Sequence, residues 1–147
     1  MEPIQLRSDL RSKIIAATPA VVFAAIADPQ RIARWWGPEG FTNTIHKFNF
    51  VEGGSWLLTM HGPDGKDYPN ESRFTRLVAN QVFEIEHLGA PHFFLTVELV
   101  PVGHATEVTW CQTFDTAEHF KQVSAFVAAA NEQNLARLSA EAMRSAA

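Results

Sequence analysis

The sequence has a single cysteine, Cys111, and a single tyrosine, and it lacks any long apolar run. One cysteine excludes an intrachain disulfide and a zinc site built from cysteines. No stretch approaches the ~20 apolar residues of a membrane-spanning helix, and the N-terminus has no apolar segment of the signal-peptide type. We therefore expect a cytoplasmic protein without a membrane span.

Clusters of positive charge are also missing. The 12 Lys and Arg residues are outnumbered by 16 Asp and Glu residues, which gives a formal net charge of -4. Nucleic acids and anionic membranes bind clustered Lys and Arg side chains, so neither is an expected partner. A phosphate-binding loop, a dinucleotide fingerprint and a nucleophile elbow are absent, because the Gly-Pro-Asp-Gly segment at 62–65 has neither the spacing nor the following helix. No cofactor is expected.

The six histidines do not form a metal-binding pattern. Zinc sites usually contain a close pair of ligands, such as two histidines four residues apart on a helix. His87 and His92 are five residues apart across a Gly-Pro turn, and the other four lie in separate predicted elements. We therefore predict no metal site, and the sequence leaves catalytic residues unassigned.

Aromatic residues are what the sequence has in quantity, with eleven Phe and four Trp. Trp35 and Trp36 are adjacent and come just before Gly37-Pro38, where a helix cannot continue because proline lacks an N–H and glycine favours turns. We interpret the pair as the rim of a cavity. The alternative is that one or both plug the end of a sheet as core residues, with the indole N–H paired inside.

The predicted order of elements is strand, two short helices, six strands and a long helix. Thr18-Pro19 and Asp28-Pro29 each place an N-cap residue before a proline, so residues 22–36 should form two short helices after a strand over residues 4–17. Alternation of apolar and polar residues then predicts strands over residues 42–50, 55–61, 68–78, 81–87, 93–99 and 108–114.

The last predicted element is an amphipathic helix from Thr116 almost to the C-terminus, with Asp115 and Glu118 as a capping box and a frayed tail from Ala140. This helix is the only long cover for the apolar face of the sheet. The sequence therefore predicts a single α+β domain over residues 1–147 with a helix-grip fold. In that fold, a curved seven-stranded antiparallel sheet wraps around the long C-terminal helix, the two short helices follow the first strand, and a hollow separates sheet and helix.

Several polar residues are predicted to face this hollow. His87 follows Phe83 and Ile85 on one strand face, where it can hydrogen-bond a ligand, act as a general base or simply bond within the sheet. Gln112 lies on an apolar face and needs a partner, which is a ligand, a water or a neighbour. Asn131 and Asn134 of the last helix can offer the same groups from the other side.

Glu71 has two possible orientations. One strand register turns its carboxylate into the hollow, and the other exposes it at the sheet surface as the partner of Arg73. Because small-molecule sites are mostly apolar with a few convergent polar groups, we predict a ligand site in the hollow. The predicted ligand-binding residues are Trp35, Trp56, Leu58, Met60, Glu71, Phe83, Ile85, His87, Phe93, Leu95, Trp110, Gln112, Val127 and Asn131.

Motifs along nearly the whole chain resemble the START-like (SRPBCC) superfamily, and within it the branch similar to the C-terminal domain of the activator of the heat-shock-protein-90 ATPase. The segments that carry this resemblance are Ile15-Ala16-Ala17-Thr18-Pro19, Val22-Phe23, Asp28-Pro29, Ala33-Arg34-Trp35-Trp36-Gly37-Pro38, Gly53-Gly54-Ser55-Trp56 and residues 60–71. The resemblance implies a helix-grip fold with a deep apolar cavity. It does not imply one activity, because relatives include lipid carriers, hormone receptors, and polyketide cyclases and aromatases.

Three functions remain open from the sequence. The first is a protein that binds a small apolar or aromatic molecule in the cavity. The second is a cyclase- or hydrolase-type enzyme that uses the same cavity, with His87 or Glu71 as acid-base group. The third is a co-chaperone-like module that binds a chaperone or another protein through its surface. An exposed edge strand would also allow two copies to pair as a homodimer.

Overall fold

The computed structural model describes residues 2–146, apart from the side chains of residues 145 and 146. Its centre is a seven-stranded antiparallel sheet in the order β1-β7-β6-β5-β4-β3-β2. The strands are β1 (Ser8–Ile15), β2 (Thr42–Phe48), β3 (Ser55–His61), β4 (Asp67–Val78), β5 (Val82–Leu88), β6 (Phe93–Val102) and β7 (Ala105–Phe114). The predicted strands are all present, although residues Ile4–Leu6 at the start of the first one form a 3-10 turn, η1.

Two short helices, α1 (Pro19–Ala27) and α2 (Pro29–Trp35), connect β1 to β2. The side chain of Thr18 accepts a hydrogen bond from the Val21 N–H, and that of Asp28 accepts one from the Gln30 N–H. Each cap stands directly before a proline, so the two helices begin where the Thr-Pro and Asp-Pro pairs predict.

The C-terminal helix α3 (Ala117–Ala146) begins differently from the prediction. Thr116 caps it, because its hydroxyl accepts a hydrogen bond from the His119 N–H at 3.1 Å. The predicted capping box with Asp115 is wrong, since that carboxylate contacts His92 instead. The predicted fraying from Ala140 is also wrong, because the helix continues to Ala146 and Glu141 is buried within it.

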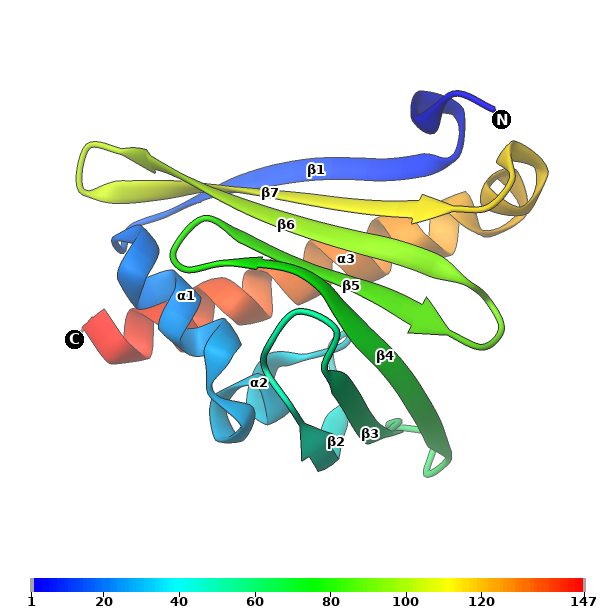
Figure 1. The fold of residues 1–147 in the computed structure, drawn as a ribbon, viewed down its shortest axis with the longest axis horizontal. Coiled ribbons are helices and arrows are strands. Elements are labelled where there is room, and N and C mark those ends of the chain that lie inside the picture. Colours follow the sequence, from blue (N-terminus) through cyan, green and yellow to red (C-terminus); the bar gives the residue numbers. More distant parts are fainter. Residues whose placement is uncertain (1, 147) are drawn as a thin grey trace.

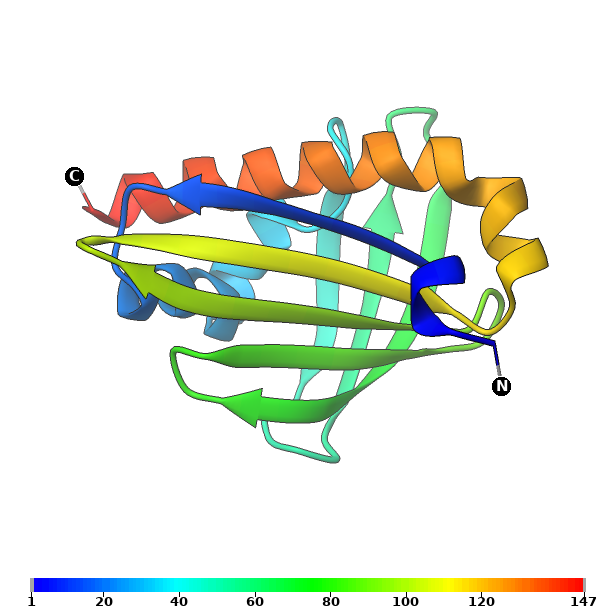
Figure 2. The same cartoon turned by 90° about the horizontal axis from the view of Figure 1, so that it is seen from above.

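The sheet curves around α3, which lies along β1 and β7 and also packs on α1 and α2. Figure 1 shows α1 and α2 closing one end of the concave face. At the opposite end, the first turns of α3 lie at an angle to the rest of the helix, as Figure 2 shows. This arrangement confirms the predicted α+β helix-grip fold. No helix within residues 2–146 has the length and apolar character to cross a membrane.

Candidate functional site on the inner face of the sheet

Strand alternation sorts the side chains onto an inner face toward α3 and an outer face away from it. The register pairs Ser72 with His87 and Leu95 with Gln112, so these residues share the inner face across β4 to β7. Cys111 lies on the outer face opposite Thr96 and is half-buried. The predicted facing of His87 and Gln112 toward the helix is therefore correct.

The end of the inner face beneath α1 and α2 is filled with aromatic rings. Trp36 contacts the rings of Trp35, Trp56 and Trp110 at centroid distances of 5.6, 4.8 and 6.1 Å. Seven predicted ligand-binding residues are 3% exposed or less here, namely Trp35, Trp56, Leu58, Phe83, Ile85, Leu95 and Trp110. They form the hydrophobic core, and their role as ligand contacts stays a prediction.

The Trp35–Trp36 pair belongs to this core and does not stand at an exposed rim. Trp35 is 1% exposed and donates its indole N–H to the Ala25 carbonyl at 2.9 Å, so it joins α2 to α1. The indole N–H groups of Trp56 and Trp110 are buried without a hydrogen-bond partner among residues 2–146. Buried polar groups without partners are rare in folded proteins, so these two donors stand out.

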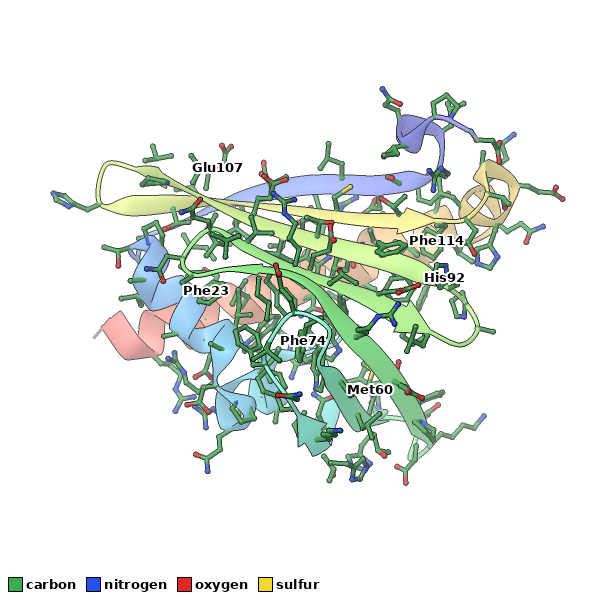
Figure 3. All side chains as sticks on the ribbon, viewed as in Figure 1. Phe23, Met60, Phe74, His92, Glu107 and Phe114 are labelled. Atoms are coloured by element: carbon green, nitrogen blue, oxygen red, sulfur yellow. The ribbon has the colours of Figure 1, made fainter. Side chains whose placement is uncertain are left out.

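The other end of the inner face is incompletely covered. Side chains that point toward α3 stay half-buried there, although a fully packed helix would bury them. We call this region the open inner surface, and its residues are Met60, Asn70, His87, Phe93 and Gln112 of the sheet with Phe120 and Val123 of α3. Figure 3 shows Met60 and Phe114 on the far side of Phe74 from Phe23, which marks the two ends.

A row of rings crosses the open inner surface from β5 to α3. The His87 ring stacks on Phe93 at 4.6 Å with an angle of 2° between the planes, and Phe93 lies 5.8 Å from Phe114. Phe114 in turn lies 6.0 Å from Phe120. Met60 closes the β3 side, where its methyl group packs beside Gly37. These side chains form an apolar strip that solvent reaches at Met60, Phe93 and Phe120, whereas Phe114 is buried.

His87 is held by two oxygen atoms. Its Nε2 lies 2.7 Å from Asn70 Oδ1, and its Nδ1 lies 2.7 Å from the Pro91 carbonyl oxygen. The Asn70 amide is oriented because its Nδ2 donates to the Tyr68 carbonyl. Of the three roles predicted for His87, hydrogen bonding to neighbouring protein groups is therefore present, and its roles as ligand contact and general base stay predictions. Asn70 was not predicted from the sequence, because it is a polar residue within a polar run and gives no periodic signal.

A polar network joins α3 to the β1 edge of the same face. Asn131 Nδ2 donates to Asp9 Oδ2 at 2.9 Å and to Gln112 Oε1 at 3.0 Å. Arg11 donates to both Asp9 oxygens, at 2.7 and 2.9 Å, and also pairs with Glu132 of α3. Burial raises the pKa of Asp9, but the hydrogen bonds from Arg11 and Asn131 and the charge of Arg11 outweigh it, so the net pKa lies below its ordinary value.

The prediction for Glu71 needs correction. The β3 and β4 register pairs Glu71 with Leu57 on the outer face, where the carboxylate is exposed. Its inward-pointing neighbour is Ser72, which is 3% exposed and sits opposite Trp56. The expected pairing with Arg73 is absent among the described residues, because Arg73 donates to Glu86 of β5. Glu71 therefore does not belong to the open inner surface.

α3 holds the loop after Trp36 through backbone carbonyls. Arg137 donates to the carbonyl oxygens of five residues, which are Arg34, Trp36, Gly37, Pro38 and Phe41. Asn134 donates to the Trp35 carbonyl and accepts from the Gly37 N–H. Burial lowers the pKa of Arg137 below its ordinary value. Asn134 is therefore a structural residue, although the sequence suggested a ligand contact.

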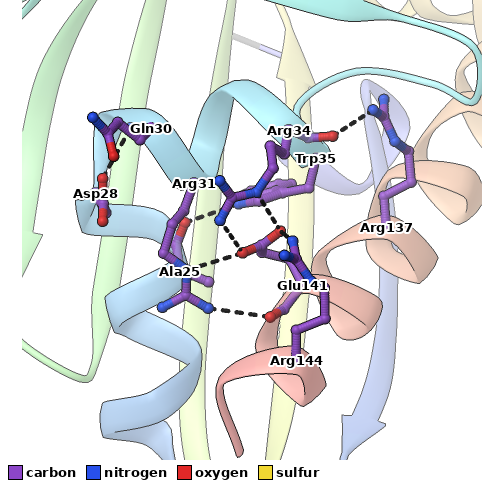
Figure 4. A network of polar contacts seen from close by, with 9 residues as sticks. All are labelled: Ala25, Asp28, Gln30, Arg31, Arg34, Trp35, Arg137, Glu141 and Arg144. Carbon is purple, nitrogen blue, oxygen red and sulfur yellow. Dashed lines mark hydrogen bonds and ion pairs between the residues drawn. The ribbon is translucent and has the colours of Figure 1, made fainter.

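A buried carboxylate anchors the C-terminal end of α3, as Figure 4 shows. Glu141 is 4% exposed and accepts hydrogen bonds from Arg31, Arg34 and Arg144. The hydrogen bond from Arg34 is the main cause that lowers the pKa of Glu141 to about 2, against the opposing effect of burial. This cluster was not predicted from the sequence, because charged residues on a helix resemble a solvated face. The signal was the helical spacing of Asn134, Arg137 and Glu141.

Two open depressions also mark the described surface, and the wall of the second includes Asn70 of the open inner surface. One has a volume of about 500 Å³ between α2 and β2, lined by Pro29, Gln30, Ala33, Ile45, His46, Lys47 and Phe48. The other has about 440 Å³ beside β3 and β4, and Glu71 is part of its wall.

Val127 and Asn131 are buried on the sheet-facing side of α3. Across residues 2–146, no group of three His, Cys, Asp or Glu side chains is arranged to hold a metal ion.

The fold and the open inner face define a START-like helix-grip domain. Residues 16–142 match the family described as activator of Hsp90 ATPase homolog 1-like protein. This chain belongs to that family. A search of curated proteins finds no match.

Solved structures repeat the fold at low sequence identity. A protein from Arthrobacter aurescens is 23% identical with a TM-score of 0.87, over 98% of this chain and 90% of that one. A protein from Nitrosomonas europaea is 15% identical with a TM-score of 0.86, over 98% and 99%. The AHSA1 protein from Silicibacter pomeroyi is 18% identical with a TM-score of 0.71, over 91% and 96%. At these identities the likeness concerns the fold.

Proposed function

We propose that this protein binds a small apolar or aromatic molecule on the open inner surface. The observation that carries the proposal is the half-burial of the inner-facing side chains Met60, His87 and Phe93. Phe93 and Met60 point toward α3 as core residues would, yet solvent reaches both, whereas Trp56 and Phe83 at the other end are fully covered. Partly exposed apolar side chains on a concave face gain free energy when a ligand covers them.

The polar groups of this surface support the same function. His87 and Gln112 stand at the edges of the apolar strip, each held by hydrogen bonds to neighbours. A mostly apolar surface with a few fixed polar groups is typical of small-molecule sites. Their contacts with protein atoms hold both side chains in fixed orientations, which supports a preorganised surface.

The family name supports a second candidate, which is binding to a chaperone of the Hsp90 type. Such binding would use the exterior of the domain. Leu10 and Ile14 of β1 are 65% and 55% exposed on the outer face, where a partner protein would cover them. Substitutions on the inner face would then leave partner binding unchanged, which separates this candidate from the first.

Two neighbouring phenylalanines of β6 give a matched test. Phe93 points to the inner face, and Phe94 points to the outer face and is 36% exposed. The fluorescence of the uncharged apolar dye N-phenyl-1-naphthylamine should rise when it is mixed with the protein. Phe93→Gln should weaken dye binding at least tenfold, whereas Phe94→Gln should leave it unchanged. Circular dichroism checks that both variants are folded. Equal effects of the two substitutions would overturn the proposal, and His87→Gln repeats the test if Phe93→Gln does not fold.

A further inference from the structure

The orientation of one amide group on the open inner surface follows from its neighbours. An ionised carboxylate only accepts hydrogen bonds. Asp9 is 7% exposed, and Arg11 donates to both of its oxygen atoms, so Asp9 is held as a carboxylate. The amide of Asn131 must therefore turn its nitrogen toward Asp9, which it does at 2.9 Å.

The second hydrogen of Asn131 Nδ2 fixes the orientation of the Gln112 amide. Asn131 Nδ2 also donates to Gln112 Oε1 at 3.0 Å, so both of its hydrogens are used. Because the oxygen of Gln112 is occupied by Asn131, its amide nitrogen points elsewhere. No hydrogen bond among residues 2–146 occupies Gln112 Nε2, and this atom is not among the buried unpaired ones. It therefore stays available as a donor.

We propose that the ligand of the open inner surface carries an oxygen acceptor, a carbonyl or carboxylate group, that accepts a hydrogen bond from Gln112 Nε2. The proposal rests on the proposed function above and adds the chemical class of the ligand. Gln112 is a specificity residue, and Asp9 and Asn131 are positioning residues that hold its amide in the donating orientation. The ligand is thus an apolar or aromatic ketone or acid and not a plain hydrocarbon.

The place of Gln112 fits this role. It lies on the inner face two residues before Phe114, whose partner on β6 is the half-buried Phe93, so an acceptor bound to Gln112 belongs to a molecule that also extends to the Phe93 ring. The low pKa of Asp9 keeps its carboxylate ionised at neutral pH, which maintains the direction of the two donated hydrogen bonds. Reversal of the amide would place two oxygen atoms, those of Asn131 and Asp9, against each other.

Acetophenone and ethylbenzene test the inference, because they have nearly the same shape and differ in a carbonyl group. Each probe is titrated into the ¹⁵N-labelled protein, and the ratio of the two dissociation constants is compared between wild type and Gln112→Leu. Acetophenone and ethylbenzene differ in their hydration. This difference is the same for wild type and Gln112→Leu, so it cancels when the two ratios are compared. Loss of one hydrogen bond should shift the ratio roughly fivefold against acetophenone. An unchanged ratio overturns the inference.

The positioning residues have their own readout. Asp9→Asn introduces a donor opposite Asn131, so the amides of Asn131 and Gln112 can both reverse. The preference for acetophenone should then fall, whereas ethylbenzene should bind as before. A purely structural role of Asp9 would change the affinity for both probes equally, which would overturn this part. If Gln112→Leu does not fold, the Gln112 side-chain NH₂ resonances of the wild type decide. They should shift with acetophenone and not with ethylbenzene, and the reverse contradicts the inference.

Failure of this inference and of the proposed function give different results. If both probes bind the open inner surface and the ratio is insensitive to Gln112→Leu, the proposed function stands and the acceptor requirement falls. If neither probe binds there, the proposed function itself is wrong.

Discussion

Arg137 Nη1 lies 2.8 Å from the carbonyl oxygen of Gly37, which joins the middle of α3 to the loop that follows the tryptophan pair. The same guanidinium reaches four other carbonyl oxygens, of which Trp36 and Phe41 bracket the loop. Gly37 has a φ of 94°, a left-handed conformation that favours glycine, so the loop needs outside contacts to hold its path. One side chain thereby fixes the boundary between core and open inner surface.

Arg137→Met should destabilise the protein by about 3 kcal/mol, because several carbonyl oxygens lose a charged donor in a partly buried place. Chemical denaturation measures the change in the free energy of unfolding. Arg76→Met is the control, since Arg76 is exposed and has no hydrogen bond among the described residues, and we expect a change within about 0.5 kcal/mol. Equal effects of the two substitutions would show that the carbonyl contacts contribute little.

Trp35→Phe should cost more stability than Trp110→Phe. Both indoles are 1% exposed, but Trp35 donates to the Ala25 carbonyl and Trp110 Nε1 has no partner among residues 2–146. The first substitution leaves a buried carbonyl without its donor, so we expect a difference of about 1–2 kcal/mol in the free energy of unfolding. A larger loss with Trp110→Phe would mean that its N–H has a partner in solution, such as a water or a ligand.

Glu141 should make the protein sensitive to acid. Its pKa is about 2 in the folded protein and 4.5 ordinarily, so its contribution is complete above pH 4.5 and is lost as pH falls from 4.5 toward 2. Glu141→Gln should lower the stability at pH 7 by about 2 kcal/mol, because Arg31 and Arg34 lose their common partner. The substitution should also flatten the pH dependence in this window. An unchanged acid profile would contradict this role.

His92 should make the stability of the protein fall as pH rises, opposite to the effect of Glu141. Hydrogen bonds raise the pKa of the imidazole above 6.5, and the bond to Glu86 contributes more than the bond to Asp115. The stabilisation is therefore complete below pH 6.5 and is lost as pH rises through the raised pKa. His92→Gln should remove this loss, with a change below about 1 kcal/mol because the pair is partly exposed. An NMR titration of His92 that gives a pKa at or below 6.5 would contradict the assignment.

The faces of the strands could be predicted wherever large apolar residues alternate. Phe83, Ile85 and His87 share a face in the structure because their period of two matches the pleat. The orientation of Glu71 could not be predicted, since Asn70, Glu71 and Ser72 are all polar and either register satisfies the pattern. The structure chooses the register that buries Ser72 beside Trp56.

The filling of the hollow was beyond sequence analysis for a different reason. The sequence shows that Trp35, Trp56 and Trp110 face inward but not how far α3 stands from the sheet. That distance depends on long-range polar contacts, such as those of Asn131 with Asp9, which are 122 residues apart. Such contacts give no periodic signal, so a cavity predicted along the whole helix becomes a packed core with one open end.

The direct test of the central claim is a methyl NMR titration. The sequence has three methionines, and selective ¹³C labelling of their methyl groups reports on Met60 of the open inner surface and on Met143 near the end of α3. Addition of N-phenyl-1-naphthylamine should shift the Met60 signal strongly and leave the Met143 signal in place, because an aromatic ring bound beside Met60 changes its local field. A bound dye that leaves Met60 unshifted would contradict ligand binding at this surface.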